Sequence, residues 1–197
     1  MISLSQEELQ RRAKQLQLLI LDVDGVLTGG ELLLSGGDVE IKQFHFHDGL
    51  GVMLLRSAGI KVAFMSDRHS PALERRAREM SIDEISPVVA GNKEESLGNL
   101  LKKLGLTPEQ AGYVGDDLRD VPPMKLVALP ISVANGRPEV KQHSVHVTTT
   151  PGGQGAVREA AEWLLDLRGQ KEQLIAPLIQ TAAEQAAARV SSKSNQA

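Results

Sequence analysis

Apolar residues occur along this chain in short runs of strand length, separated by longer segments in which they recur at helical spacing. The run at 18–21, Leu-Leu-Ile-Leu, has no polar interruption, which is typical of a central strand covered on both faces. The later pattern predicts strands at 61–65, 86–89, 112–115, 130–133 and 145–148, and helices at 49–58, 70–80, 92–104, 121–127, 137–142 and 155–168. This alternation predicts an α/β fold built on a doubly wound, mainly parallel Rossmann-like sheet.

Three segments depart from the alternation. Residues 31–47 hold a Ser-Gly-Gly-Asp turn between two partly apolar runs, which predicts a β-hairpin insertion. Ser5 and Glu8 have the spacing of a capping box, so a short helix is expected near the N-terminus. Residues 170–197 are rich in Ala, Gln and Ser, with apolar residues at helical spacing. We therefore expect one domain over residues 1–169 and a helical tail with a frayed end over 170–197.

Composition and charge narrow the chemistry. The 197 residues include no cysteine, which excludes thiolate catalysis, disulfides and Cys-ligated metal centres. A net charge of -3 and few aromatic residues argue against a nucleic-acid partner. The charged N-terminal segment does not resemble a secretory signal, and no run reaches the roughly 20 apolar residues of a membrane span. A soluble, cytoplasmic protein with no membrane partner is expected.

Polar residues follow four of the predicted strands. Asp22 and Asp24 come after the first strand and Ser66 after the second, while Lys93 lies near the third and Asp116 after the fourth. Ligands of open α/β sheets bind beyond the carboxyl ends of the strands, so these side chains are expected in one crevice.

The expected crevice combines carboxylates with phosphate-binding groups. Carboxylates gathered without compensation repel one another and tend to protonate, which a divalent cation prevents. Oxygen ligands without sulfur select Mg²⁺. Lys93 and the Ser66 hydroxyl suit a phosphate. The residues therefore predict metal-assisted phosphoryl transfer.

Four segments resemble, in order, the motifs of the haloacid dehalogenase-like phosphatases. They are Asp22-Val23-Asp24-Gly25-Val26-Leu27-Thr28, the strand ending at Ser66, Lys93, and Gly115-Asp116-Asp117-Leu118-Arg119-Asp120. Within that superfamily, the hairpin, Asp48-Gly49-Leu50-Gly51 and the segment 152–159 are similar to the 3-deoxy-D-manno-octulosonate 8-phosphate phosphatases. The resemblance covers about residues 17–168.

The resemblance implies a role for each motif residue. Asp22 is the expected nucleophile, which forms an aspartyl-phosphate, and Asp24 is the acid and base for the leaving group and then for water. Ser66 is expected to bind the transferring phosphoryl group and Lys93 to neutralise its charge.

The resemblance also implies a metal site and an assembly. Mg²⁺ is expected to be bound by the Asp22 carboxylate, the Asp24 backbone carbonyl and Asp116. Asp117 is expected to support these ligands without touching the ion itself. The implied protein has no large cap domain and is instead closed as a homotetramer through the 31–47 hairpin. The implied setting is lipopolysaccharide biosynthesis.

The expected substrate contacts are His47, Asp48, Gly49, Arg68, Arg76 and Lys93. Arg68 and Arg76 match family positions that meet the substrate.

Several positions depart from the family pattern. His47, Met53 and Gln154 stand where the family carries Arg usually, often and commonly, respectively, and Asp67 follows Ser66 where Gly is usual. A bidentate Arg is the preferred clamp for a carboxylate. A nine-carbon ulosonate 9-phosphate or another small sugar phosphate thus stays open as the substrate. A non-catalytic oligomerisation or regulatory domain is the alternative of another class, although a scaffold has no reason to cluster carboxylates.

Three further features have two interpretations each. Asp120 either caps a helix beginning at Val121 or touches the site. His45 and His47 share one face of a predicted strand, where an interface or substrate contact is expected in preference to a transition metal. The glycine-rich loop 152–155 either binds an anion or turns the chain.

Overall fold

Six parallel strands form the central sheet in the order β5-β4-β1-β6-β7-β8. The computed structural model describes residues 1–34 and 40–194. The strand bounds are β1 Leu18–Asp22, β4 Lys61–Ser66, β5 Glu84–Pro87, β6 Ala111–Gly115, β7 Leu129–Ser132 and β8 His146–Val147. The predicted α/β fold with a doubly wound sheet is confirmed, and the described residues contain no large cap domain.

The strand β1 is buried at all five positions because helices cover both faces of the sheet. Leu19 and Leu21 pack into the core beneath one layer of helices, whereas Leu18 and Ile20 pack into the core beneath the other. The two-residue period of a strand sends neighbouring side chains to opposite faces, so an unbroken apolar run supplies both cores.

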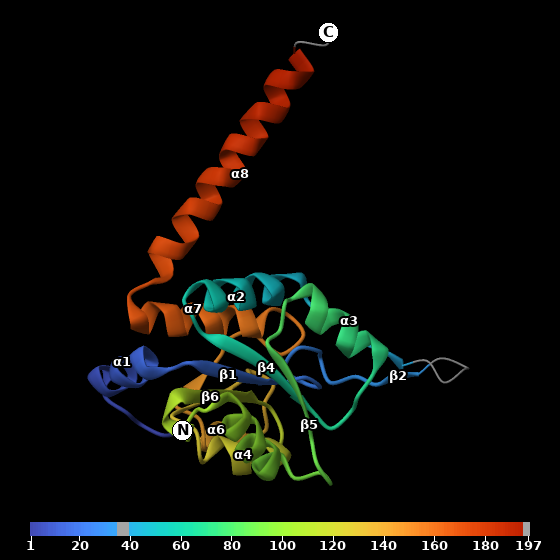
Figure 1. The fold of residues 1–197 in the computed structure, drawn as a ribbon, viewed down its shortest axis with the longest axis vertical. Helices are drawn as coiled ribbons and strands as arrows, with labels where there is room; N and C mark the ends of the chain where they lie inside the picture. The colour runs from blue at the N-terminus through green and yellow to red at the C-terminus, as the bar shows by residue number, and fades with distance from the viewer. Residues whose placement is uncertain (35–39, 195–197) are drawn as a thin grey trace.

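The two helical layers lie on opposite sides of the sheet (Figure 1). One layer contains α1 (Gln6–Gln15), α2 (Phe46–Ser57), α3 (Pro71–Glu79) and α7 (Ala156–Arg168). The other contains α4 (Lys93–Leu104), α5 (Val121–Met124) and α6 (Pro138–Gln142). Two 3-10 turns, η1 (Pro108–Gln110) and η2 (Leu118–Asp120), precede β6 and α5 respectively. The Ser5 hydroxyl caps α1 by accepting from the backbone N–H of Glu8 at 3.2 Å, as the spacing predicts.

The predicted hairpin is present but shorter than 31–47. It consists of β2 (Leu33–Leu34) and β3 (Glu40–Ile41), paired antiparallel, and its predicted turn lies outside the described residues. The strand interpretation of His45 and His47 is wrong, because α2 begins at Phe46. His45 is its N-cap, and the Nδ1 atom of His45 accepts from the backbone N–H of His47 at 3.3 Å.

Other boundaries move by a few residues. The strand predicted at 86–89 begins at Glu84, where pairing with Ala63 of β4 starts, and Val89 is exposed instead. The helix predicted over 121–127 begins at Val121 as expected but ends at Met124 as the short α5, and η2 precedes it. The helical tail is present as α8 (Lys171–Ser194), which runs through Pro177 and projects away from the sheet layers (Figure 1). No helix among the described residues is long and apolar enough to cross a membrane.

Candidate active site

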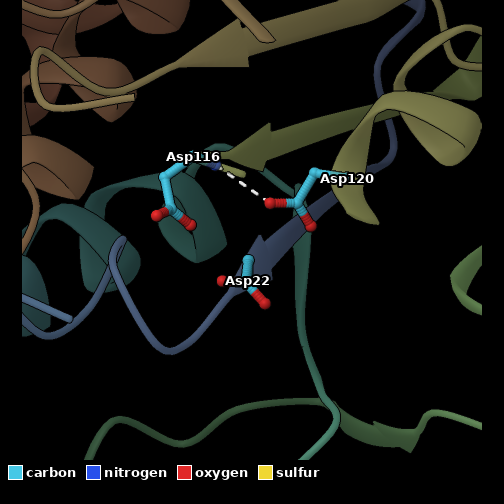
Figure 2. Close-up of side chains that lie close together, drawn as sticks. All are labelled: Asp22, Asp116 and Asp120. Atoms are coloured by element: carbon cyan, nitrogen blue, oxygen red, sulfur yellow. Dashed lines mark hydrogen bonds between the residues drawn. The ribbon is translucent and has the colours of Figure 1, made fainter. Parts of the chain in front are cut away.

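Three carboxylates meet where β1 and β6 end. Asp22 is the last residue of β1, and Asp116 follows β6, which lies beside β1 in the sheet with Leu21 opposite Val114. Asp120 reaches the same place from the end of η2. One carboxylate oxygen from each aspartate lies within 4.8 Å of the other two (Figure 2). The adjacency of parallel strand ends thus produces the convergence that the sequence predicts.

Lys93 is the cation of this cluster. It is the first residue of α4, and its side chain is 5% exposed. Its Nζ atom lies 2.5 Å from Asp22 Oδ1 and 2.7 Å from Asp120 Oδ1. A lysine in a first helical turn opposes the helix dipole, so these two carboxylates compensate an otherwise unfavourable position.

Asp120 belongs to the site, although the sequence left its role open. Its buried carboxylate accepts from the Tyr113 hydroxyl at 2.8 Å and from the backbone N–H groups of Asp116 at 3.0 Å and Asp117 at 3.2 Å. Figure 2 marks the hydrogen bond between Asp116 and Asp120. It makes no side-chain cap to α5. Asp120 therefore holds the loop after β6 in place. The only sequence signal was an acidic residue four positions after Asp116.

Burial and mutual repulsion shift the ionisation of the cluster. Burial, followed by the charge of Asp120, raises the pKa of Asp22. The same two causes raise the pKa of Asp116 to about 6. Burial opposes the charge of Lys93, but the carboxylates of Asp22 and Asp120 outweigh it and raise the lysine pKa. Three carboxylates and one ammonium leave two negative charges uncompensated when all are ionised.

The residues present fit a hard divalent cation. The Oδ1 atom of Asp116 is buried and accepts no hydrogen bond within the described part of the chain. Buried carboxylate oxygens are stable when a donor or a cation engages them. Carboxylate oxygens without nitrogen or sulfur ligands suit Mg²⁺.

Gly25 brings the loop after β1 against this carboxylate. Its φ is +106°, and a Cβ at this position would lie 2.1 Å from Asp116 Oδ2. Glycine is required here because it adopts a positive φ readily and has no Cβ to collide with the carboxylate. The backbone beside Asp24 therefore reaches the Asp116 carboxylate directly.

The side chains of Asp24 and Ser66 make their contacts outside the three-carboxylate cluster. The Asp24 side chain is 35% exposed and forms an ion pair with Lys42 of the hairpin segment. Ser66 ends β4, the strand on the other side of β1, and its hydroxyl accepts from Arg68 N at 3.1 Å and donates to Arg68 O at 3.0 Å. Lys42 was missed by the sequence analysis, because only the fold brings it to Asp24.

The other expected substrate contacts occupy varied places. Asp48 is buried in the first turn of α2, and Arg76 Nη2 donates to His45 O at 2.9 Å. His47 is exposed, and a Cβ on Gly49 would lie 3.5 Å from Arg76 Nη2. Arg68 forms an ion pair with Glu40 at 2.7 Å. Asp117 caps η2 by accepting from Leu118 N at 2.7 Å.

The glycine-rich loop packs on the loop after β1. A Cβ on Gly152 would lie 1.8 Å from Gly25 O, and one on Gly153 would lie 2.3 Å from Gly29 N. Asn135, which the sequence analysis missed, joins the two loops by donating to Gly25 O at 3.3 Å and accepting from Gly152 N at 2.7 Å. The loop thus supports the backbone that follows Asp24.

A cavity of about 210 Å³ lies between the hairpin and this glycine-rich loop. It is lined by Thr28, Gly29, Glu31, Leu33, Gln43, Gly152, Gly153 and Gln154. Among the described residues, its lining carries hydroxyl, amide and carboxylate groups and no cation.

The chain is similar in sequence and fold to known proteins. Residues 84–159 match the family described as haloacid dehalogenase-like hydrolase. The 3-deoxy-D-manno-octulosonate 8-phosphate phosphatase KdsC of Haemophilus influenzae is 38% identical over 162 residues, which span 82% of this chain and 89% of that protein. The KdsC of Escherichia coli K12 is 36% identical over 162 residues, 82% of this chain and 86% of that protein. A crystal structure of a 3-deoxy-D-manno-octulosonate 8-phosphate phosphatase from Moraxella catarrhalis, in complex with magnesium ion, phosphate ion and KDO, has a TM-score of 0.83 and 35% identity, and the match covers 87% of this chain and 98% of that one.

Proposed function

Because the chain belongs to the 3-deoxy-D-manno-octulosonate 8-phosphate phosphatases, a family of haloacid dehalogenase-like hydrolases, we propose that it hydrolyses 3-deoxy-D-manno-octulosonate 8-phosphate to the free sugar acid and phosphate. The observation that carries this proposal is the convergence of Asp22, Asp116 and Asp120 around Lys93. A nucleophilic carboxylate and a fixed ammonium suit phosphoryl transfer, and the uncompensated negative charge of the cluster suits a divalent cation beside them.

The reaction proceeds in two displacements. A carboxylate oxygen of Asp22 attacks phosphorus, the bond from phosphorus to the sugar oxygen breaks, and Asp24 gives that oxygen a proton. Water then attacks the phosphorus of the aspartyl-phosphate and passes a proton to Asp24, so that phosphate leaves and Asp22 is regenerated. Splitting the hydrolysis in this way replaces one difficult step by two easier ones.

Lys93 and Ser66 act on the phosphoryl oxygens. The Lys93 ammonium stands beside the attacking carboxylate, where it offsets the charge that accumulates in transfer. The Ser66 hydroxyl lies on the neighbouring strand end and supplies a hydrogen-bond donor once it turns from Arg68 O.

Mg²⁺ is the proposed cofactor, held by the carboxylates of Asp22 and Asp116 and by the backbone carbonyl of Asp24. When bound, it neutralises charge on the phosphoryl oxygens and on the clustered carboxylates. The buried Oδ1 atom of Asp116, which accepts no hydrogen bond from any described residue, supports this assignment. Asp117 supports the loop that carries Asp116.

The sugar body is proposed to lie beside the hairpin. The cavity that Gln43 and Gln154 line offers amide groups to sugar hydroxyls. Arg68 and Arg76 are proposed to bind the substrate carboxylate, and His47, Asp48 and Gly49 complete the segment proposed to meet the substrate.

The proposal includes a homotetramer in the cytoplasm. Leu33, Leu34 and Ile41 of the hairpin are 46%, 69% and 52% exposed, and Phe46 at the start of α2 is 86% exposed. An exposed hairpin with such apolar residues favours a subunit contact. A cytoplasmic location accords with a phosphate ester substrate, whose charge hinders passage through an apolar membrane.

A panel of phosphate esters tests the proposal. Phosphate release is measured for 3-deoxy-D-manno-octulosonate 8-phosphate, a nine-carbon ulosonate 9-phosphate and simple sugar phosphates, with Mg²⁺ and with EDTA. We expect the highest kcat/KM for the eight-carbon ester and no turnover in EDTA until Mg²⁺ is restored. A higher kcat/KM for another ester would correct the substrate, whereas full activity in EDTA or inactivity on every ester would contradict the proposal.

A further inference from the structure

The hairpin segment carries a buried lysine beside the proposed acid and base. Lys42 directly follows β3, and its side chain is 4% exposed. Its ammonium forms ion pairs with Oδ1 of Asp24 and with Oε1 of Glu40, which lies 3.0 Å away. Charged lysines are buried in proteins only when they are paired. The two carboxylates therefore determine where this ammonium rests.

Glu40 extends these contacts to the loop after β4. Its Oε2 atom accepts from Arg68 Nη2 at 2.7 Å and Arg68 Nε at 3.2 Å. The backbone of Arg68 is in turn bonded to the Ser66 hydroxyl. Charges of alternating sign thus connect the hairpin with Asp24 and with the loop after β4, which begins beside Ser66.

Lys42 engages only one oxygen of the Asp24 carboxylate. The contact is made to Oδ1, and no described residue donates a hydrogen bond to Oδ2. A carboxylate fixed through one oxygen has fewer accessible orientations, and it keeps the other oxygen for proton transfer. General acid–base catalysis depends on such fixed geometry within hydrogen-bond reach of the reacting atom.

We propose that Lys42 is a positioning residue for Asp24, so that the hairpin insertion orients the acid and base of the reaction. This inference rests on the proposed phosphatase function. The Asp24 proton passes to the sugar oxygen as its bond to phosphorus breaks, and the attacking water later returns a proton. Lys42 keeps its own protons throughout.

Two esters distinguish positioning from other roles of Lys42. The sugar ester releases an alkoxide that needs a proton, whereas p-nitrophenyl phosphate releases a phenolate that leaves without one. Release of the leaving group is measured in a single turnover with enzyme in excess, which separates this step from the later attack of water. Lys42→Met removes the charge and keeps the length of the side chain, and Lys14→Met at an exposed position of α1 is the control.

A specific pattern is expected. Lys42→Met slows sugar release by about 10- to 100-fold, part of the contribution that general acid–base catalysis makes, and changes p-nitrophenol release by less than about threefold. Lys42→Arg, which keeps a cation, recovers part of the sugar rate, and Lys14→Met changes neither. In an Asp24→Asn background, Lys42→Met adds no further loss on the sugar ester, because the residue it positions is gone.

Other patterns overturn the inference. Equal losses on both esters, or a change in KM alone, would assign Lys42 to folding or to phosphate binding, and would leave the proposed function standing. A wild-type protein that hydrolyses neither ester would overturn the proposed function as well. Should Lys42→Met fail to fold, Glu40→Gln removes one of the two charges that face Lys42, and it is expected to show the same difference between esters at smaller size.

Discussion

The Oδ1 atom of Asp48 accepts a hydrogen bond from the backbone N–H of Arg158 at 3.2 Å, so a side chain of α2 caps the first turn of α7. The N-cap position of α7 is Gly155, which has no side chain to offer. A Cβ on Gly51 would lie 2.8 Å from Arg158 Cα, which shows how closely the two helices approach. Asp48 thereby fixes the helix that follows the glycine-rich loop of the site.

Asp48 should make stability depend on pH. Burial raises its pKa to about 6, against the opposing effect of the Arg158 N–H. The unfolded chain loses this proton near pH 4, so the folded state holds an extra proton between about pH 4 and pH 6. The contribution of Asp48 to the free energy of unfolding therefore falls across that window by on the order of 2 kcal/mol as pH rises.

Asp48→Asn isolates this contribution, because Asn keeps the accepting oxygen and does not titrate. Urea unfolding of both proteins in EDTA at several pH values gives the difference in unfolding free energy. We expect the wild type to lose unfolding free energy relative to Asp48→Asn as the pH rises from about 4 to about 6. Asp116, whose pKa is also raised to about 6, titrates in both proteins, so its contribution to the pH dependence cancels in the difference. A difference that stays constant with pH would show that Asp48 is not buried as described.

Gly25→Ala should weaken the metal site. The added Cβ would overlap the Asp116 carboxylate, and φ at this position is +106°. We expect the Mg²⁺ concentration for half-maximal activity to rise at least about 10-fold, the lower range for losing support of a metal ligand. Gly59→Ala is the matched control, since φ is +79° there and a Cβ meets nothing within 4 Å. It should cost stability by about 1 kcal/mol and leave the Mg²⁺ requirement unchanged; equal effects of the two substitutions on Mg²⁺ would refute the argument.

Lys93→Met should destabilise the protein as well as inactivate it. The substitution leaves Asp22 and Asp120 buried without their shared cation, which typically costs about 3–5 kcal/mol for a broken buried pair. Mg²⁺ should recover part of this loss, because it also compensates the carboxylates. Urea unfolding with Mg²⁺ and with EDTA measures both effects. Unfolding free energies equal to those of the wild type would mean that Lys93 is not the compensating charge.

Leu34→Glu should disrupt the proposed assembly. Leu34 is 69% exposed in the single chain, so the substitution costs the fold little, but it places a charge in the proposed subunit contact. Light scattering after size-exclusion chromatography should show a lower mass for Leu34→Glu than for the wild type. Leu126→Glu, at an exposed position that follows α5, should keep the wild-type mass. A wild-type mass for both variants would remove the hairpin from the interface.

The residues that the sequence identified are those whose placement follows from local pattern. The unbroken apolar run ending at Asp22 predicts a central strand, and parallel strands necessarily bring their polar ends together. Lys42 and Asn135 act through partners far along the chain, so only tertiary packing reveals them. Asp120 was ambiguous because a carboxylate before a helix usually caps it.

The error around α2 has a local cause. Phe44 and Phe46 alternate with His45 and His47, which imitates the two-residue period of a strand. Phe46 is 86% exposed, so burial of its side chain does not favour a strand conformation of the backbone here. The His45 cap and the capping of α7 by Asp48 favour the helix instead.

Mass spectrometry of the acid-quenched protein during turnover tests the central account most directly. If the Asp22 carboxylate attacks phosphorus, the peptide that contains Asp22 gains one phosphoryl group in the presence of substrate and Mg²⁺, and Asp22→Asn shows neither this species nor turnover while its circular dichroism spectrum stays that of the wild type. Phosphate found on another residue, or Asp22→Asn retaining more than a few per cent of wild-type kcat, would contradict it.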